Sequence, residues 1–159
     1  MAERFAGPVV RELRKAGWSP GRRVDCRAMV GAVCERVGRH GARLEAFAAA
    51  TAVLEEFGSL YVGQDGPGIA FRRRPFAIEA AHVTVVAETL TDFGRVLRTR
   101  LFPIGMEGDH DSILAVDEAG RVFALDHGGE WFLGESIDAA LSTLITGADQ
   151  PRVRDDGTW

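Results

Sequence analysis

The sequence predicts a single α+β domain in which N-terminal, central and C-terminal helices flank a mixed, mainly antiparallel sheet. Apolar residues recur at helical spacing as far as Gly58, the spacing then shortens, and the C-terminal third contains a hairpin pattern. Because helices and strands are grouped rather than alternating as β-α-β, the pattern favours α+β over a doubly wound fold. The 159 residues are typical of one domain, which we place at residues 1–147, with a polar tail at 148–159.

Three helices are predicted before the spacing changes. The first ends at Gly17, the second runs from about Asp25, a suitable N-cap, to about Gly38, and the third ends at Gly58. Their apolar stripes are Phe5, Val9, Leu13 and Ala16; Cys26, Met29, Val30, Val33 and Val37; and Leu44, Phe47, Thr51 and Leu54.

Short strands and a further helix are predicted in the middle of the chain. Residues 60–62, 69–71 and 76–78 read as strands, and a glycine-rich loop at 63–68 separates the first two. The helix that follows is indicated by Val83, Val86, Leu90, Phe93 and Leu97.

The C-terminal third carries the clearest pattern. Residues 113–117 and 121–126 form a predicted hairpin with Gly120 in its turn, and 131–133 form a further strand. Both hairpin strands are apolar on both faces, which predicts a sheet covered on each side. A last helix should begin after the N-cap Ser136 and end at Gly147, and the polar tail beyond it is expected to fray.

Charge and hydropathy exclude several classes of function. A net charge of −4 and a pI of about 5.6 argue against direct nucleic-acid binding, which requires an excess of basic residues. We find no apolar run of the roughly 20 residues that a membrane span needs, and no secretory signal in residues 1–16. The sequence therefore predicts a cytoplasmic protein.

No catalytic, cofactor-binding or metal-binding residues are predicted. The loop at 63–68 lacks the Lys-Ser/Thr and the helix that phosphate binding requires. On one helix, Cys26 and Cys34 would lie about 12 Å apart, too far for a disulfide or, with His40, for a shared zinc ion. Asp109-His110-Asp111 could hold a metal or an acid–base pair, but adjacent loop residues rarely converge on one point, so a solvated loop is expected.

Arg72, Arg73 and Arg74 form the one dense run of positive charge. The run could contact a carboxylate-rich partner or phosphate, or it could be a solvated loop or edge strand. The sequence leaves these alternatives open.

Four stretches together resemble the third class of the SUKH superfamily of bacterial immunity proteins. They are AGWSPGR at 16–22, LEEFGSL at 54–60, LFPIG at 101–105, and the run 113–147 with its DEAGRV hairpin and GxSxxxAL helix. The resemblance extends from about residue 12 to residue 147 and implies a SUKH-like fold. The glycine, proline and tryptophan residues in these motifs fit a structural role rather than a catalytic one.

The resemblance implies an immunity protein that binds a cognate toxin domain of a polymorphic toxin system, without a cofactor and without catalysis. Such toxins are often nucleases or nucleic-acid deaminases. The resemblance does not identify the toxin, and the chain could be a monomer or a homodimer.

Candidate partner-binding residues follow from the residue types that interfaces prefer. Tyrosine, tryptophan and arginine are frequent anchors, and acidic residues suit a basic groove on a toxin. The candidates are Tyr61, Arg72, Arg73, Arg74 and Trp131, with the acidic Asp65, Glu107, Asp109 and Asp111. Tyr61 and Trp131 could equally belong to the core.

Two other functions remain open at this stage. One is a non-catalytic scaffold or regulatory module that binds a protein other than a toxin. The other is an enzyme that uses residues 109–111, for which a stoichiometric metal ion would be the evidence.

Overall fold

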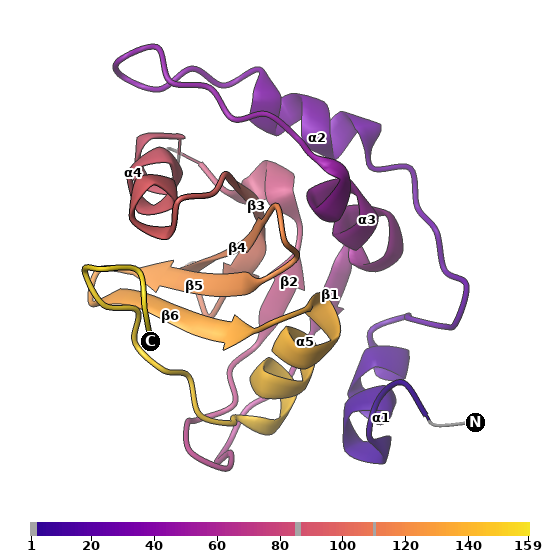
Figure 1. The fold of residues 1–159 in the computed structure, drawn as a ribbon. Coiled ribbons are helices and arrows are strands. Elements are labelled where there is room, and N and C mark those ends of the chain that lie inside the picture. Colours follow the sequence, from indigo (N-terminus) through magenta and orange to yellow (C-terminus); the bar gives the residue numbers. More distant parts are fainter. Residues whose placement is uncertain (1–2, 85–86, 110) are drawn as a thin grey trace.

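The computed structural model describes residues 3–84, 87–109 and 111–159 and contains a six-stranded sheet with helices on both sides (Figure 1). The strands lie in sequence order, and every pairing between neighbours is antiparallel. They are β1 (Leu60–Val62), β2 (Phe76–Ile78), β3 (Leu101–Glu107), β4 (Ser112–Asp117), β5 (Val122–Asp126) and β6 (Gly129–Gly134). The α+β prediction is confirmed.

The helices cover the sheet from both sides (Figure 1). They are α1 (Gly7–Lys15), α2 (Arg27–Cys34), α3 (Ala48–Phe57), α4 (Ala87–Leu97) and α5 (Ile137–Thr146), with a 3-10 turn η1 (Ala80–His82). α4 packs on one face, where Phe93 meets Phe123 of β5 at 5.5 Å between ring centroids. α1, α3 and α5 lie together on the other side of the sheet (Figure 1). No described helix is long and apolar enough to cross a membrane.

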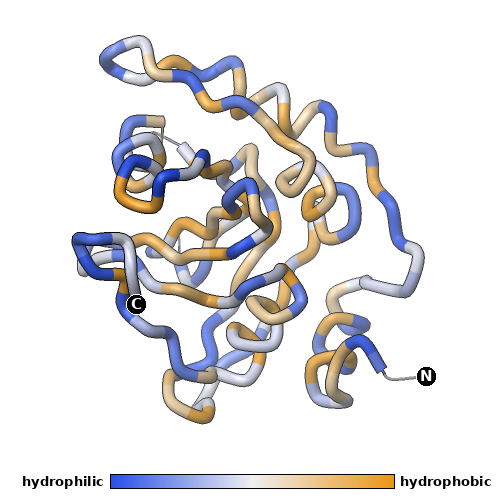
Figure 2. The backbone as a smooth tube through the Cα atoms, viewed as in Figure 1, coloured by the Kyte–Doolittle hydropathy of each residue, from blue (hydrophilic) through white to orange (hydrophobic). Residues whose placement is uncertain are grey.

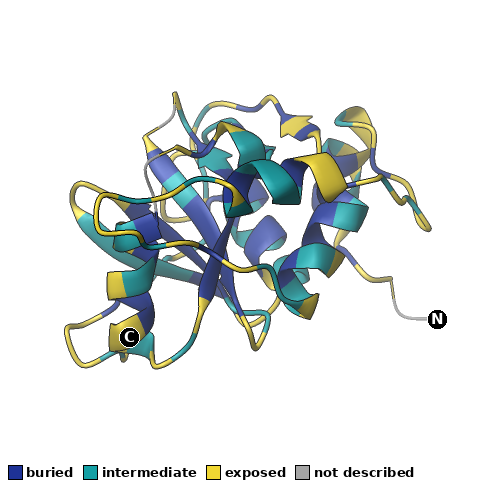
Figure 3. Ribbon diagram, turned by 90° about the horizontal axis from the view of Figure 1, so that it is seen from above, coloured by how far each residue is buried: buried dark blue, intermediate teal, exposed yellow. Residues whose placement is uncertain are grey.

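The core lies between the sheet and these helices, as the dark strands in Figure 3 show. Its largest fully buried side chains include Phe57, Phe76, Phe102 and Phe123. Burying aromatic side chains of this size supplies much of the apolar area that stabilises a domain. Hydrophilic residues gather in the C-terminal tail (Figure 2).

The predicted boundaries of α5 are confirmed. The Ser136 hydroxyl accepts a hydrogen bond from the Ala139 N–H at 3.2 Å, as an N-cap does. Gly147 adopts a left-handed conformation with φ of +67°, which ends the helix at low steric cost.

Strand β3 was not predicted as a strand, because Pro103 and Gly105 are unfavourable in a strand interior. β2 pairs only with Met106 and Glu107, so the half of β3 that contains Pro103 has one neighbouring strand, β4. A β-bulge lies between Pro103 and Gly105. A Cβ at Gly105 would approach the carbonyl oxygen of Ala77 to 1.9 Å, so glycine alone fits this close contact.

Several predicted elements differ from the structure. α3 begins only at Ala48, so Leu44 and Phe47 precede it, and the N-cap of α2 is Cys26 rather than Asp25. Residues 69–71 form no strand, because their N–H groups bond the C-terminal end of α5 instead of a strand. α2 spans only Arg27–Cys34, and both cysteines are free. α4 begins at Ala87, so Val83 lies before it at the end of η1, and Val86 lies outside the described residues.

The prediction that the tail frays is wrong. Arg152 forms a bridge with Trp131, and the Val153 N–H donates to the Glu130 carbonyl oxygen at 2.9 Å. The Trp159 ring stacks on Phe132 with centroids 4.4 Å apart. The tail is polar in composition, but its few apolar side chains pack on β6. The spacing of residues in the sequence does not indicate this packing.

Candidate functional site

The predicted arginine run lies in the connection between β1 and β2. Arg72 and Arg73 stabilise the conformation of this connection. Arg72 Nη2 lies 2.7 Å from a carboxylate oxygen of Asp65, and this ion pair holds the pKa of Asp65 below its usual value. Arg73 donates from Nη2 to the Asp65 carbonyl oxygen at 2.8 Å. Arg72 and Asp65 remain exposed, so this pair can also meet a partner.

The same connection is tied to α5 by backbone hydrogen bonds. The N–H groups of Ile69 and Phe71 donate to the carbonyl oxygens of Thr146 and Gly147 at 3.0 and 2.9 Å. The buried Gln64 amide nitrogen donates to the Leu144 carbonyl oxygen at 2.8 Å. These bonds satisfy carbonyl groups at the end of a helix and fix the connection in place.

Arg74 has a structural role, because it is the counter-ion of a buried carboxylate. Its Nη2 lies 3.0 Å from Glu107, and its Nη1 lies 3.1 Å from Asp111. Glu107 is only 6% exposed, so its side chain is not accessible to a partner. Burial raises the pKa of Glu107 despite the hydrogen bond from Arg74, which acts in the opposite direction.

The turn between β3 and β4 presents the other predicted acidic residues. Asp109 and Asp111 are exposed, while His110 lies outside the described residues. Among the described residues, no group of three His, Cys, Asp or Glu side chains is placed to hold a metal ion.

Tyr61 and Trp131 lie on the two outermost strands. Tyr61 of β1 is 61% exposed, which favours the interface over the core. Trp131 of β6 is half-buried, and the Arg152 guanidinium lies 5.8 Å from its ring centroid. The tail therefore already covers part of Trp131.

Sequence reasoning missed a groove on the sheet face that carries Tyr61. The register pairs Met106 with Ile113 and Ile113 with Leu125, so these three side chains lie on one face. Phe123, two residues before Leu125, shares that face and is covered by α4 and by Trp159. The half of the face nearer Met106 is left as a cavity of about 390 Å³, which we call the sheet-face groove.

The rim of the sheet-face groove is acidic. Asp111, Asp126 and Glu130 line it together with His82 and His127. The sequence signal was available in part, because residues 113–116 and 122–125 are apolar on both faces. That signal predicted a sheet covered on each side, whereas within the described residues the half of this face near Met106 remains a groove.

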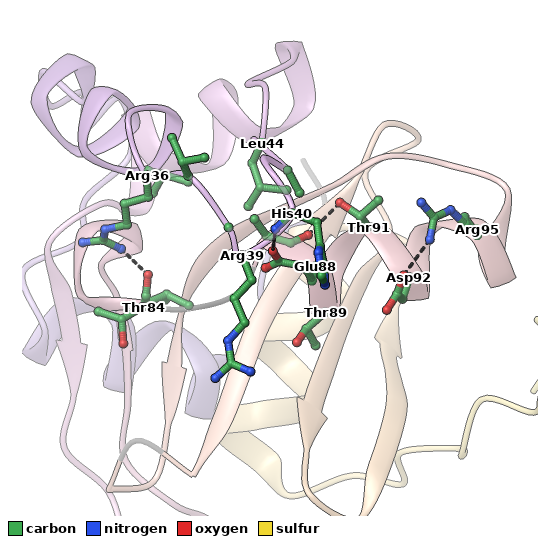
Figure 4. Close-up of a pocket in the computed structure, with 16 residues that line it drawn as sticks. Arg36, Arg39, His40, Leu44, Thr84, Glu88, Thr89, Thr91, Asp92 and Arg95 are labelled. Carbon is green, nitrogen blue, oxygen red and sulfur yellow. Dashed lines mark hydrogen bonds and ion pairs between the residues drawn. The ribbon is translucent and has the colours of Figure 1, made fainter.

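A larger groove of about 830 Å³ lies between α4 and the α2–α3 connection (Figure 4). Arg36 donates to the carbonyl oxygens of Ala81 and Val83. Glu88 accepts from the His40 N–H at 3.2 Å, and Arg95 pairs with Asp92 at 2.6 Å (Figure 4). Most of the charged groups here hold the connection onto α4 or pair with one another.

Comparison with known proteins assigns the chain at the family level. A family model described as SUKH-3 immunity protein matches residues 5–147, which is most of the chain. No curated protein and no solved structure gives a significant match. The match includes every strand of the sheet and ends at Gly147, before the tail that packs on β6.

Proposed function

The chain belongs to the SUKH-3 immunity protein family, and from that membership we propose that it neutralises one cognate toxin domain by binding it. The family match over residues 5–147 is the observation that carries this proposal. The protein acts in the bacterial cytoplasm, where its toxin reaches it.

The toxin is a nuclease or nucleic-acid deaminase of a polymorphic toxin system. Either activity requires a basic surface that holds phosphate groups. The net charge of this chain, −4, suits such a partner and disfavours competition by nucleic acid for the same surface.

The mechanism is stoichiometric blockade. The protein covers the substrate channel of the toxin, or holds the toxin in an inactive conformation, through an interface of roughly 1,200–2,000 Å². Binding alone accounts for this effect, so the protein is not an enzyme and needs no cofactor.

The exposed candidates supply the proposed contacts. Tyr61, Arg72, Asp65, Asp109 and Asp111 are accessible, and hot-spot residues of interfaces are often aromatic or arginine side chains. Arg73, Arg74 and Trp131 are half-buried and supply smaller contacts at the edge of the interface. Glu107 acts by orienting Arg74.

The test is co-expression with the toxin-like C-terminal domain encoded beside the gene, scored by growth and by co-purification. We expect growth to be restored and a stable one-to-one complex to be recovered. If the neighbouring domain is toxic and is neither neutralised nor bound, the proposal fails, and a scaffold that binds another protein becomes the better explanation.

A further inference from the structure

The floor of the sheet-face groove is an apolar surface that the described part of the chain leaves open, with α4 contributing Thr89 to the lining. Met106 and Ile113 are half-buried neighbours on β3 and β4, and Leu125 continues the row on β5. Tyr61 and Ala77 extend the same row to β1, because Tyr61 pairs with Ala77 and Ala77 with Met106. The row thus runs from a buried leucine to a tyrosine that is 61% exposed.

Negative charge predominates at the rim of this floor. Asp111, Asp126 and Glu130 line the groove, and its described lining contains neither arginine nor lysine. Arg74 pairs with Asp111 of the rim and with Glu107 outside it, and Arg152 lies over Trp131. Within the described residues, Asp126 and Glu130 therefore make no ion pair, and they lie beside the half-buried Met106 and Ile113.

Two of the rim carboxylates, Asp111 and Asp126, are held in place before any partner arrives. Asp126 accepts from the Gly128 N–H at 2.7 Å and from the Ser112 hydroxyl at 3.4 Å. Asp111 accepts from Arg74 at 3.1 Å. Groups that are already oriented lose little conformational entropy on binding, which favours affinity.

We infer that the sheet-face groove receives an arginine- or lysine-bearing segment of the toxin. The long methylene chains of these residues would lie on Met106 and Ile113, and their charged ends would reach the carboxylates. This inference rests on the proposed function, since a toxin that acts on nucleic acid carries such basic segments. It adds residues that sequence reasoning did not nominate, namely Met106, Ile113, Asp126 and Glu130.

The larger groove beside α4 suits such a segment less well. Arg36, Arg39 and Arg95 line it, and its acidic residues Glu88 and Asp92 are both paired. A basic segment would meet positive charge there, so charge complementarity selects the sheet-face groove.

The test compares two variants with the same change in net charge. Asp126→Lys/Glu130→Lys reverses the rim, whereas Glu35→Lys/Glu135→Lys reverses two exposed carboxylates that make no side-chain hydrogen bond within the described residues. Calorimetric titration with the cognate toxin domain should show binding at least about tenfold weaker for the first variant, and nearly wild-type binding for the second.

A milder variant, Asp126→Asn/Glu130→Gln, guards against misfolding, because it keeps the shapes of both side chains. It should fold normally by circular dichroism and still bind several-fold more weakly than wild type. Equal affinities for the rim variants and the control would overturn the inference while leaving the immunity function intact.

If the wild-type protein does not bind the toxin at all, the proposed function fails. Binding of a basic segment to the sheet-face groove is then tested with a peptide. A nine-residue arginine peptide, followed by NMR, should shift the signals of Met106, Ile113 and Leu125, and Asp126→Lys/Glu130→Lys should abolish those shifts. Shifts scattered over the acidic surface, or no shifts at all, would contradict the inference.

Discussion

At the scale of single residues, Arg72 and Arg74 belong to one run but have different roles, because their surroundings differ. Arg72 and its partner Asp65 are both largely exposed, whereas the partner of Arg74, Glu107, is buried. Exposed ion pairs contribute little to stability, but a buried carboxylate that loses its counter-ion is costly.

We therefore expect Arg74→Ala to lower the free energy of unfolding by about 2–3 kcal/mol. The same change at Arg72 should cost less than about 1 kcal/mol, since water already solvates that pair. Urea unfolding of both variants measures the difference. Equal effects would show that Glu107 does not depend on Arg74.

The raised pKa of Glu107 predicts how stability depends on pH. Because the folded state holds this proton more tightly than the unfolded state does, Glu107 favours folding at low pH. That contribution is lost as the pH rises above the ordinary glutamate pKa and through the raised one.

Glu107→Gln removes this titration while keeping a polar partner for Arg74. The free energy of unfolding of the variant minus that of wild type should become more positive between about pH 4 and pH 7. Urea titrations at several pH values measure it. A difference that stays flat, or that falls with pH, would mean that the pKa of Glu107 is not raised.

The sequence could identify the arginine run but not its partners. Arg74 and Glu107 lie 33 residues apart, and only the pairing of β2 with β3 brings them together. Asp109 and Asp111 needed no such information, because polar turns usually face solvent. The sequence left Tyr61 open between core and interface, and only the structure shows that it is exposed.

At the scale of elements, the sequence predicted those segments whose ends carry local signals. Ser136 and Gly147 define α5, and Gly120 defines the β4–β5 hairpin. β3 and the tail lack such signals, because Pro103 and Gly105 in β3, and the polar residues of the tail, are tolerated only through contacts with distant parts of the chain.

Gly105→Ala should lower the free energy of unfolding by about 3 kcal/mol, because the added methyl group would press on the Ala77 carbonyl. Gly31→Ala in α2 is the matched control. Nothing lies within 4 Å of a Cβ there, and alanine should stabilise the helix by up to about 1 kcal/mol. Thermal melting distinguishes the two, and a tolerated Gly105→Ala would require β2 to move.

Trp159→Ala should cost about 2 kcal/mol, since it removes a ring that stacks on Phe132 and lies 5.4 Å from the Arg121 guanidinium. Arg154→Ala in the same tail is an exposed control and should change stability by less than about 0.5 kcal/mol. Hydrogen exchange should also speed up at Val153, whose N–H bonds β6. Unchanged exchange there would mean that Trp159 does not anchor the tail.

At the scale of the whole molecule, the net negative charge of the chain should raise the rate at which it associates with its toxin. The rate constant for association should fall several-fold between about 0.05 and 0.5 M salt, because screening weakens long-range attraction. Stopped-flow fluorescence measures it. A rate constant independent of salt would remove electrostatic attraction from the proposed mechanism.

The order of the strands also bears on how quickly the protein becomes ready to act. Each strand of the sheet pairs with the next one along the chain, and the β2–β3 link, which contains α4, is the longest between neighbours. Sheets built from such near neighbours close short loops and fold faster than sheets with crossed strand order. The sheet can also assemble progressively, from β1 onward, as the chain leaves the ribosome. An immunity protein can bind its toxin only after it has folded. Because this topology favours fast folding, it shortens the time between synthesis of the chain and protection of the cell.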